Sequence, residues 1–328
     1  MLRLLLTGST GFVGSHVAEL LAREGMAVRA LARPTSRTGR LEAVGAEIVL
    51  GALADPGTLD LAVSGVDAVI HMAACTHART EAEYSATNAV ATARLVRAMR
   101  EARPRPGCLV YLSSLAAAGP ARDGRPVRPG DTPGPITAYG RSKLAGERAC
   151  LEAGEEFRVV ILRAPAVYGP RDREMFRFFR FASLGWIPVP GDGSRPVQLV
   201  HVTDLANAIR LAATRTDVSG TFHIAESRTY VMSAVARLVA DAVGGSVRIV
   251  QVPGALVRAA AAAAEAANGA LGRSSQLNRD KARELLAAGW LCETECARRA
   301  LGFEAAVALP AGLSATAEWY RQNGWLKA

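Results

Sequence analysis

The most informative segment of this 328-residue chain is Leu2-Arg3-Leu4-Leu5-Leu6-Thr7-Gly8-Ser9-Thr10-Gly11-Phe12-Val13-Gly14. The apolar run predicts a buried strand, and the residues after the third glycine predict an amphipathic helix. Glycines at this spacing allow a tight turn, close approach of a pyrophosphate, and close packing of the helix on the strand. Free N–H groups and the helix dipole would then meet the phosphate charge. We therefore predict a dinucleotide site at Gly8, Thr10, Gly11, Phe12, Val13 and Gly14.

Short apolar runs alternate with helical patterns through the first two-thirds of the chain. Continuous apolar runs are typical of strands covered on both faces. Strand-helix alternation predicts βαβ units with right-handed crossovers. The predicted class is therefore α/β, with a Rossmann-type doubly wound parallel sheet. The strands are predicted at Leu2–Leu6, Ala27–Ala32, Glu47–Leu50, Ala68–His71, Cys108–Leu112 and Arg158–Leu162, with helices that include Phe12–Glu24, Tyr84–Ala102 and Ala138–Ala153.

The pattern loosens after about Arg163. Prolines and glycines predict loops around one helical stretch. These loop-forming residues are Pro165, Gly169, Pro170, Pro188, Pro190, Gly191 and Gly193. Further elements are predicted at Glu174–Leu184, Gln198–Val200, Thr203–Ala213, Thr221–Ile224 and Val247–Val250, in a remainder that is largely helical. We expect a dinucleotide-binding domain over residues 1–165, to which 198–225 return, and a smaller, mostly helical substrate-binding lobe over 166–328.

The composition of the chain argues against nucleic-acid binding, a membrane span and a cysteine metal site. The net charge is +9, but only Lys143, Lys281 and Lys327 are lysines, and the arginines form no basic run. An arginine-rich coding bias explains this charge better than a nucleic-acid partner does. No apolar stretch reaches the roughly 18 residues of a membrane span. Five scattered cysteines show no metal spacing and fit a reducing, cytoplasmic setting.

The end of the second predicted strand bears on cofactor choice. An NAD-selective site commonly has an acid here that accepts a hydrogen bond from the ribose 2′-hydroxyl. This chain has Ala32 and Arg33 instead, with Arg37 shortly after. An arginine at this place would pair with a 2′-phosphate, so the sequence favours NADP over NAD. The alternative is that both arginines are simply solvated.

A second group of residues predicts proton transfer. Ser114 ends the fifth predicted strand, and Tyr139 and Lys143 lie four residues apart at the start of a helix. Ligands of open α/β sheets bind at the carboxyl ends of the strands, and residues i and i+4 share a helix face. An ammonium beside a phenol lowers its pKa, so the phenol can exchange a proton with a substrate hydroxyl. Ser114 would orient the substrate oxygen, and Lys143 could also reach the cofactor ribose.

These motifs resemble the extended short-chain dehydrogenase/reductase family, also called the epimerase/dehydratase family. The resemblance covers nearly the whole chain. Its markers are Thr7–Gly14, His71-Met72-Ala73-Ala74, Asn88, Ser114, Tyr139 to Lys143, Val167-Tyr168-Gly169-Pro170 and Val200-His201-Val202-Thr203-Asp204. The resemblance implies that Gly8, Gly11 and Gly14 hold the pyrophosphate, that Ala73 and Ala74 line the cofactor, and that Ala164 to Val167 approach the nicotinamide. It also implies a homodimer built on the helices that carry Asn88 and Tyr139.

Departures from the family pattern narrow the reaction. Ala52 stands where an acid often meets adenine, so adenine recognition would rest on the backbone and Leu53. Ala166 replaces the asparagine of sugar-nucleotide members, and Leu115-Ala116 replace the acid pair of dehydratases. The remaining likeness is to hydroxysteroid-dehydrogenase-like and dihydroflavonol-reductase-like members. The phenylalanines between 176 and 181, with Trp186, suit an apolar substrate, although such a cluster is more often core.

The sequence thus predicts an NAD(P)-dependent oxidoreductase that interconverts a mainly apolar secondary alcohol and ketone. A nucleotide-sugar epimerase that uses the same three residues is the enzymatic alternative. A non-catalytic NAD(P)-binding scaffold or sensor is the alternative from another class, although such a protein has no need of a matched phenol and ammonium.

Overall fold

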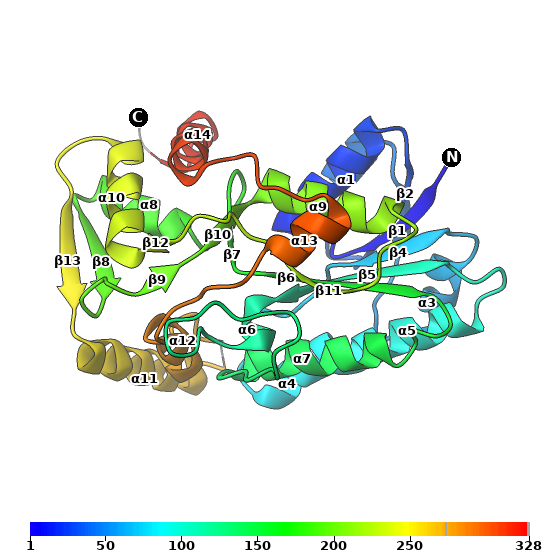
Figure 1. Ribbon diagram of the computed structural model, residues 1–328, viewed down its shortest axis with the longest axis horizontal. Helices are drawn as coiled ribbons and strands as arrows, with labels where there is room; N and C mark the ends of the chain where they lie inside the picture. The colour runs from blue at the N-terminus through cyan, green and yellow to red at the C-terminus, as the bar shows by residue number, and fades with distance from the viewer. Residues whose placement is uncertain (273, 327–328) are drawn as a thin grey trace.

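A computed structural model describes residues 1–272 and 274–326 of the chain (Figure 1). Its centre is a parallel sheet of seven strands in the order β11-β6-β5-β4-β1-β2-β3, so the predicted α/β class and doubly wound sheet are confirmed. Strand order reverses between β1 and β4, and ligands of open sheets bind at such a switch point. The strands are β1 (Arg3–Thr7), β2 (Ala27–Ala32), β3 (Glu47–Leu50), β4 (Ala68–His71), β5 (Cys108–Ser114), β6 (Arg158–Ala164) and β11 (Gly220–His223).

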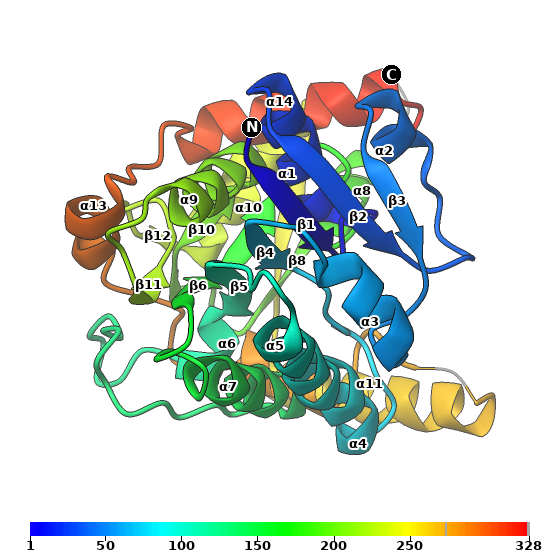
Figure 2. The ribbon, with the colours of Figure 1, turned by 90° about the vertical axis from the view of Figure 1, so that its right-hand side faces the viewer.

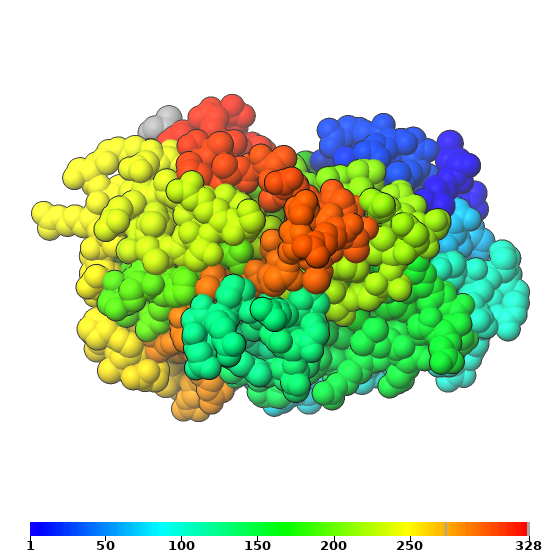
Figure 3. Space-filling model, viewed as in Figure 1, coloured from blue at the N-terminus to red at the C-terminus, as the bar shows by residue number. Residues whose placement is uncertain are grey.

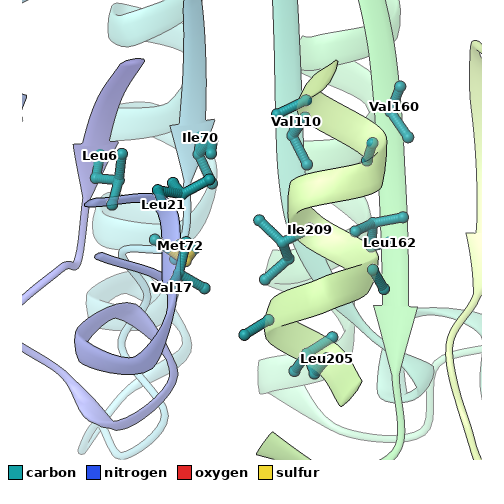
Figure 4. Close-up of a cluster of buried hydrophobic side chains, with 14 of the residues drawn as sticks. Leu6, Val17, Leu21, Ile70, Met72, Val110, Val160, Leu162, Leu205 and Ile209 are labelled. Atoms are coloured by element: carbon teal, nitrogen blue, oxygen red, sulfur yellow. The ribbon is translucent and has the colours of Figure 1, made fainter. Parts of the chain in front are cut away.

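Helices cover both faces of this sheet because strand side chains alternate between the faces. Leu4 and Leu6 of β1 pack into one buried cluster and Leu5 packs into the other. Figure 4 shows part of the first cluster, where α1 and α9 lie on the strands, and Figure 2 shows the layers along the strands. The covering helices are α1 (Phe12–Arg23), α9 (Val202–Thr214) and α13 (Glu295–Leu301) on the first face, and α3 (Pro56–Val63), α5 (Ala91–Glu101) and α7 (Ala138–Leu151) on the second.

The residues outside the sheet build a second core around Phe179 and Tyr320. Three small two-stranded sheets pair β7 with β10, β8 with β13 and β9 with β12. Figure 3 shows the C-terminal residues, in orange and red, lying across the surface of both halves of the molecule. The elements are β7 (Ala166–Tyr168), β8 (Trp186–Pro190), β9 (Pro196–Val197), β10 (Leu199–His201), β12 (Tyr230–Val231), β13 (Arg248–Val252), α8 (Phe176–Ser183), α10 (Met232–Val243), α11 (Gly254–Ala270), α12 (Arg279–Leu285) and α14 (Leu309–Gln322).

Strand β8 corrects the sequence prediction, which placed a loop at Pro188 and Pro190. Both prolines lie inside the strand, which pairs in parallel with β13. A proline lacks the backbone N–H donor. Strand β8 tolerates this loss because it has a partner strand on one side, and no inter-strand hydrogen bonds are needed on the other side. Ile187 and Val189, which alternate with the prolines, are fully buried and anchor the strand.

None of the helices in the described part of the chain combines the length and apolar character that crossing a bilayer requires.

The predicted single helix over Tyr84–Ala102 is interrupted. It consists of α4 (Glu81–Ser85), a π-helical turn over Ala86–Val90 and α5. The turn places Asn88 in the interior, where its amide donates to the Cys75 carbonyl at 2.9 Å and accepts from the Cys75 N–H at 2.7 Å. A π-turn inserts one residue into a helix and often marks a functional site. Here the π-helical turn places the Asn88 side-chain amide against the loop that follows β4.

Helix α7 approaches its neighbours closely because Gly146 has no side chain. A Cβ built on Gly146 would collide with the Asn88 carbonyl oxygen and the Tyr111 hydroxyl, and would lie 3.0 Å from the Tyr111 Cζ. Both neighbours are buried and cannot move aside. Gly146 therefore sets the distance between α7, the π-helical turn and β5.

We predict that Gly146→Ala lowers the free energy of unfolding by about 1–3 kcal/mol, the range for overpacked cores. The matched control is Gly269→Ala in α11, where a Cβ would meet nothing within 4 Å. That change should stabilise the protein by up to about 1 kcal/mol, since glycine is a poor helix residue. Urea titration of both variants, followed by circular dichroism, tests the pair. Equal stability of the two variants would contradict the packing argument.

Candidate active site

One large cavity of about 1800 Å³ lies at the carboxyl ends of the strands. Its walls come from both halves of the molecule. The glycine loop, the ends of β2, β4, β5 and β6, and the start of α7 form one side. The segments after β7 and around α10 and α12 form the other. Every residue predicted for the cofactor or the proton transfer lines this cavity: Gly8, Thr10, Gly11, Phe12, Val13, Gly14, Arg33, Ala52, Leu53, Ala73, Ala74, Ser114, Tyr139, Lys143, Ala164 and Val167.

The glycine loop has the geometry that a pyrophosphate needs. Gly8 has a φ of +73°, and a Cβ there would lie 2.6 Å from the Ala73 nitrogen, so the end of β4 fits only against glycine. A Cβ on Gly14 would lie 2.6 Å from the Ser9 Cα. Gly11 precedes α1, and no side chain caps the helix or places an acid in its first turn. The first N–H groups of α1 have no partner within the helix and open on the cavity, where they could bind a phosphate.

The end of the cavity that follows β2 is basic. Arg33, Ser36 and Arg37 follow β2 and line the cavity. Neither Arg33 nor Arg37 makes an ion pair with a carboxylate in residues 1–272 and 274–326, whereas Arg40 lies 3.9 Å from Glu19. The guanidinium groups of Arg33 and Arg37, which have no carboxylate partner among these residues, could pair with a phosphate on the ribose.

Three local structures position the residues predicted to transfer a proton. Ser114 ends β5 and caps the short helix α6 (Leu115–Ala118), because its hydroxyl oxygen accepts from the Ala116 N–H at 3.1 Å. Tyr139 is in the first turn of α7, which Thr137 caps by accepting from the Gly140 N–H at 3.0 Å. Lys143 follows one turn later. All three residues line the same cavity.

The Tyr139 phenol is held in its protonated form. Burial raises its pKa above the ordinary value, while the hydrogen bond that it shares with the Ser114 hydroxyl lowers the pKa. The net result is a raised pKa, which differs from the sequence expectation that Lys143 lowers it. The physical reason is that removing water from a phenolate costs more than the Ser114 hydroxyl recovers. A protonated phenol is ready to donate a proton.

Lys143 is buried, with only 1% of the residue exposed. Its ammonium donates to the Leu112 carbonyl oxygen at 2.8 Å and lies 4.1 Å from the centroid of the Tyr111 ring. Burial lowers its pKa to about 8, and the Glu147 carboxylate raises the pKa. At neutral pH the group is therefore mostly a cation, although its charge is lost within the physiological range.

Sequence analysis missed a buried ion pair beneath these residues. Glu147, one turn after Lys143, accepts from Arg163 at 2.9 and 2.6 Å and from the Ser113 hydroxyl. Both charged side chains are almost fully buried. The one sequence feature that could have indicated this ion pair is a glutamate four residues after Lys143, on the same face of the helix. An arginine in β6 completes the pair, and its sequence position shows no relation to Glu147.

A chain of hydrogen bonds connects the cofactor loop to the π-helical turn. The Nδ1 of His71 pairs with the Thr7 hydroxyl and its Nε2 pairs with the Thr92 hydroxyl at 2.9 Å. Thr92 donates in turn to the Asn88 carbonyl oxygen at 2.9 Å. Burial lowers the pKa of His71 to about 3, with a further contribution from Lys143, so the ring is neutral. The motif residues His71 and Asn88 thus support the loop from within.

Two relatives are similar to this chain over most of their own length. It is 31% identical over 324 residues to a ceramide reductase of Caulobacter vibrioides, which covers 98% of this chain and 95% of that protein. It is 28% identical over 313 residues to the 4-hydroxy-2-methyl-3-oxo-4-farnesyl-3,4-dihydroquinoline-1-oxide ketoreductase of Stigmatella aurantiaca, with 87% of this chain and 91% of that protein covered.

Solved structures share the whole fold. The crystal structure of gox2253 superposes with a TM-score of 0.82 at 25% identity and covers 99% of both chains. The UDP-glucose 4-epimerase of Thermotoga maritima superposes with a TM-score of 0.79 at 22% identity, over 98% of this chain and 99% of that one, which shows the fold alone. The family described as the NAD dependent epimerase/dehydratase family matches residues 4–225, more than half of the chain. The protein belongs to the NAD-dependent epimerase/dehydratase family.

Proposed function

We propose that the protein is an NADP-dependent carbonyl reductase that converts a mainly apolar ketone to a secondary alcohol. The observation that carries this proposal is the meeting of Ser114, Tyr139 and Lys143 in one cavity with the glycine loop. The Tyr139 phenol is protonated and can serve as the proton donor that reduction of a ketone needs. The names of two relatives, a ceramide reductase and a ketoreductase, point the same way.

In this mechanism NADPH, when bound, supplies the hydride that the carbonyl carbon accepts. The Ser114 hydroxyl would hold the carbonyl oxygen in place. Tyr139 would then donate its proton to that oxygen, which gives the alcohol and leaves a phenolate. The Lys143 ammonium would stabilise this phenolate by its charge, and solvent would return the proton. Consumption of one proton and one hydride for each ketone balances the reaction.

The substrate side of the cavity supports an apolar substrate. Its wall includes the apolar residues Met175, Phe178, Val197, Leu199, Met232, Val235, Ala236, Leu285 and Trp290. The cations there are mostly engaged already. Arg171 pairs with Glu19 at 2.8 Å, and Arg195 donates to the Pro190 carbonyl at 2.7 Å. A sugar diphosphate needs cations that are not engaged in this way, so Arg171 and Arg195 are poorly suited to bind one. Arg173 also lines this wall and makes no ion pair within the described residues.

A substrate screen separates the remaining functions. NADPH consumption with apolar ketones, and none with UDP- or TDP-sugars, is the expected result. Turnover of nucleotide sugars without turnover of ketones would favour the epimerase. Tight NADPH binding without turnover of any substrate would favour the scaffold. We further propose that the protein is cytoplasmic and forms a homodimer. Analytical ultracentrifugation of the purified chain tests the homodimer.

The first prediction concerns the phenol. Tyr139→Phe should lower kcat/KM for ketone reduction by at least about 10²-fold, because the proton donor is lost. The dissociation constant of NADPH, measured by fluorescence, should change by less than about threefold. The control is Tyr230→Phe, whose hydroxyl donates to Glu226 at 2.8 Å away from the cavity wall. Full activity of the Tyr139 variant would end this mechanism.

The second prediction concerns pH. The Lys143 ammonium is charged below its pKa of about 8 and neutral above it. Reduction measured as kcat/KM should therefore fall as pH rises through about 8, because the neutral amine cannot stabilise the phenolate. Lys143→Met should be slow and should lack this descending limb, and Lys143→Arg should move the limb to higher pH. Persistence of the same limb in the methionine variant would assign it to another group.

The third prediction concerns cofactor choice. The wild-type protein should bind NADPH at least about tenfold more tightly than NADH, which is about 1.4 kcal/mol. The double variant Arg33→Ala/Arg37→Ala should lose this preference while its NADH dissociation constant stays within about twofold. Arg97→Ala, which removes an exposed arginine of α5, serves as the control. A tenfold preference of the wild type for NADH would contradict the proposal.

A further inference from the structure

Helix α12 is fixed against the start of the catalytic helix. The Asp280 carboxylate accepts from the Ala138 N–H at 2.6 Å, directly before Tyr139. Asn278 caps α12 by accepting from the Lys281 N–H at 2.8 Å, and the Trp290 indole donates to the Glu284 carbonyl at 3.0 Å. Figure 1 shows α12 beside the end of α7 that these contacts join. Segments 140 residues apart thus form one wall.

This arrangement brings a charged pair to the cavity. Lys281 and Glu284 line it together with Tyr139, and the Lys281 ammonium donates to the Glu284 carboxylate at 2.8 Å. Glu284 is one turn after Asp280, so it faces the same side of the helix. Burial is the main cause that raises the pKa of Tyr139, and the Glu284 carboxylate adds to it. The pair and the phenol therefore border the same cavity.

The position of the pair is what needs explanation. The two side chains are 35% and 33% exposed, so they are partly desolvated without being inaccessible. An exposed pair of this kind contributes little to stability, about 0–1 kcal/mol. The neighbouring wall contains the apolar residues Leu285 and Trp290, and the polar residues Gln276, Asn278 and Asp280 line it as well. Two opposite charges at the cavity surface can offer a ligand one strong donor and one strong acceptor.

The spacing of the two charged atoms limits which ligand group fits. A secondary amide presents its N–H and its carbonyl oxygen in opposite directions, so it cannot meet two atoms 2.8 Å apart. A carboxylate would be repelled by Glu284 and an ammonium by Lys281. A hydroxyl oxygen both accepts and donates at one atom. It can accept from the Lys281 ammonium and donate to the Glu284 carboxylate at once.

We propose that Lys281 and Glu284 are specificity-determining residues that bind a hydroxyl group of the substrate, which makes the preferred substrate an apolar hydroxy ketone. The inference rests on the proposed function, because Tyr139 must serve the carbonyl of the same molecule. The hydroxyl lies at the end of the cavity next to α12. The apolar remainder of the substrate lies along the wall formed by α8 and α10, at Phe178 and Val235.

The test compares long-chain ketones of equal length. One has no further polar group, and the others carry a hydroxyl on the first, second or third carbon from the carbonyl. A secondary amide at the same places completes the series. We expect one hydroxy ketone to exceed the plain ketone by at least about tenfold in kcat/KM, and the amides to gain less. A wild-type protein that reduces the plain ketone and all the others equally overturns the inference, although it upholds the proposed function.

A double variant assigns the preference to the pair. Lys281→Met/Glu284→Leu removes both charges together and leaves no unpaired one. It should lose the hydroxyl preference to within about threefold, measured as the ratio of kcat/KM for the hydroxy ketone and the plain ketone in the same variant. The matched control is Arg298→Met/Glu295→Leu, an i,i+3 pair at 2.6 Å on the surface of α13. NADPH binding checks that each variant is folded.

The outcomes are separable. Loss of the preference in the α12 variant, and its retention in the α13 control, supports the inference. An unchanged hydroxyl preference in the α12 variant overturns it. If the double variant does not bind NADPH, the single variant Lys281→Met replaces it, and the same loss of preference is expected. Failure of the wild type to reduce any ketone refutes the proposed function itself, and with it the inference.

Discussion

A cation buried at the carboxyl ends of the strands is the constraint on which the rest of the site depends. Removing an ammonium from water is costly unless it has partners, and Lys143 has a backbone carbonyl and an aromatic face. These partners belong to β5, so α7 must lie close to that strand. The glycine at position 146 permits the approach, and the ion pair of Glu147 with Arg163 lies one turn further along the same helix. Packing and charge therefore support each other at this point.

Much of this architecture follows from the sequence because its causes are local. All six strands predicted before residue 165 are present, with bounds that differ by at most two residues. Alternation of side chains along each strand, and the strand-glycine-helix order at positions 2–24, require only neighbouring residues. The predicted cofactor and proton-transfer residues all line one cavity for the same reason, since the ends of parallel strands share one side of a sheet. Their catalytic roles stay predictions.

The features that sequence analysis missed depend on contacts between distant segments. The π-helical turn at Asn88 is stabilised by bonds to the loop at Cys75 and to Ser142, and none of these is visible in a helical periodicity. Strand β8 exists because β13, about 60 residues later, pairs with it. Helix α12 faces Tyr139 because Asp280 meets the Ala138 N–H. The raised pKa of the phenol likewise depends on burial by several segments, whereas the sequence showed only its nearest cation.

The return of β11 to the main sheet has a consequence for dissecting the protein. The chain leaves the sheet after β6, builds β7 to β10, and comes back to pair residues 220–223 with 160–163. Later still, α13 adds Ala297 and Leu301 to the cluster on that face. A fragment that stops at residue 165 would leave β6 with an unpaired edge and an uncovered apolar surface. Unprotected edges of this kind recruit other chains, so such a fragment on its own would tend to aggregate. Residues 1–165 therefore lack part of the packing that completes their own sheet.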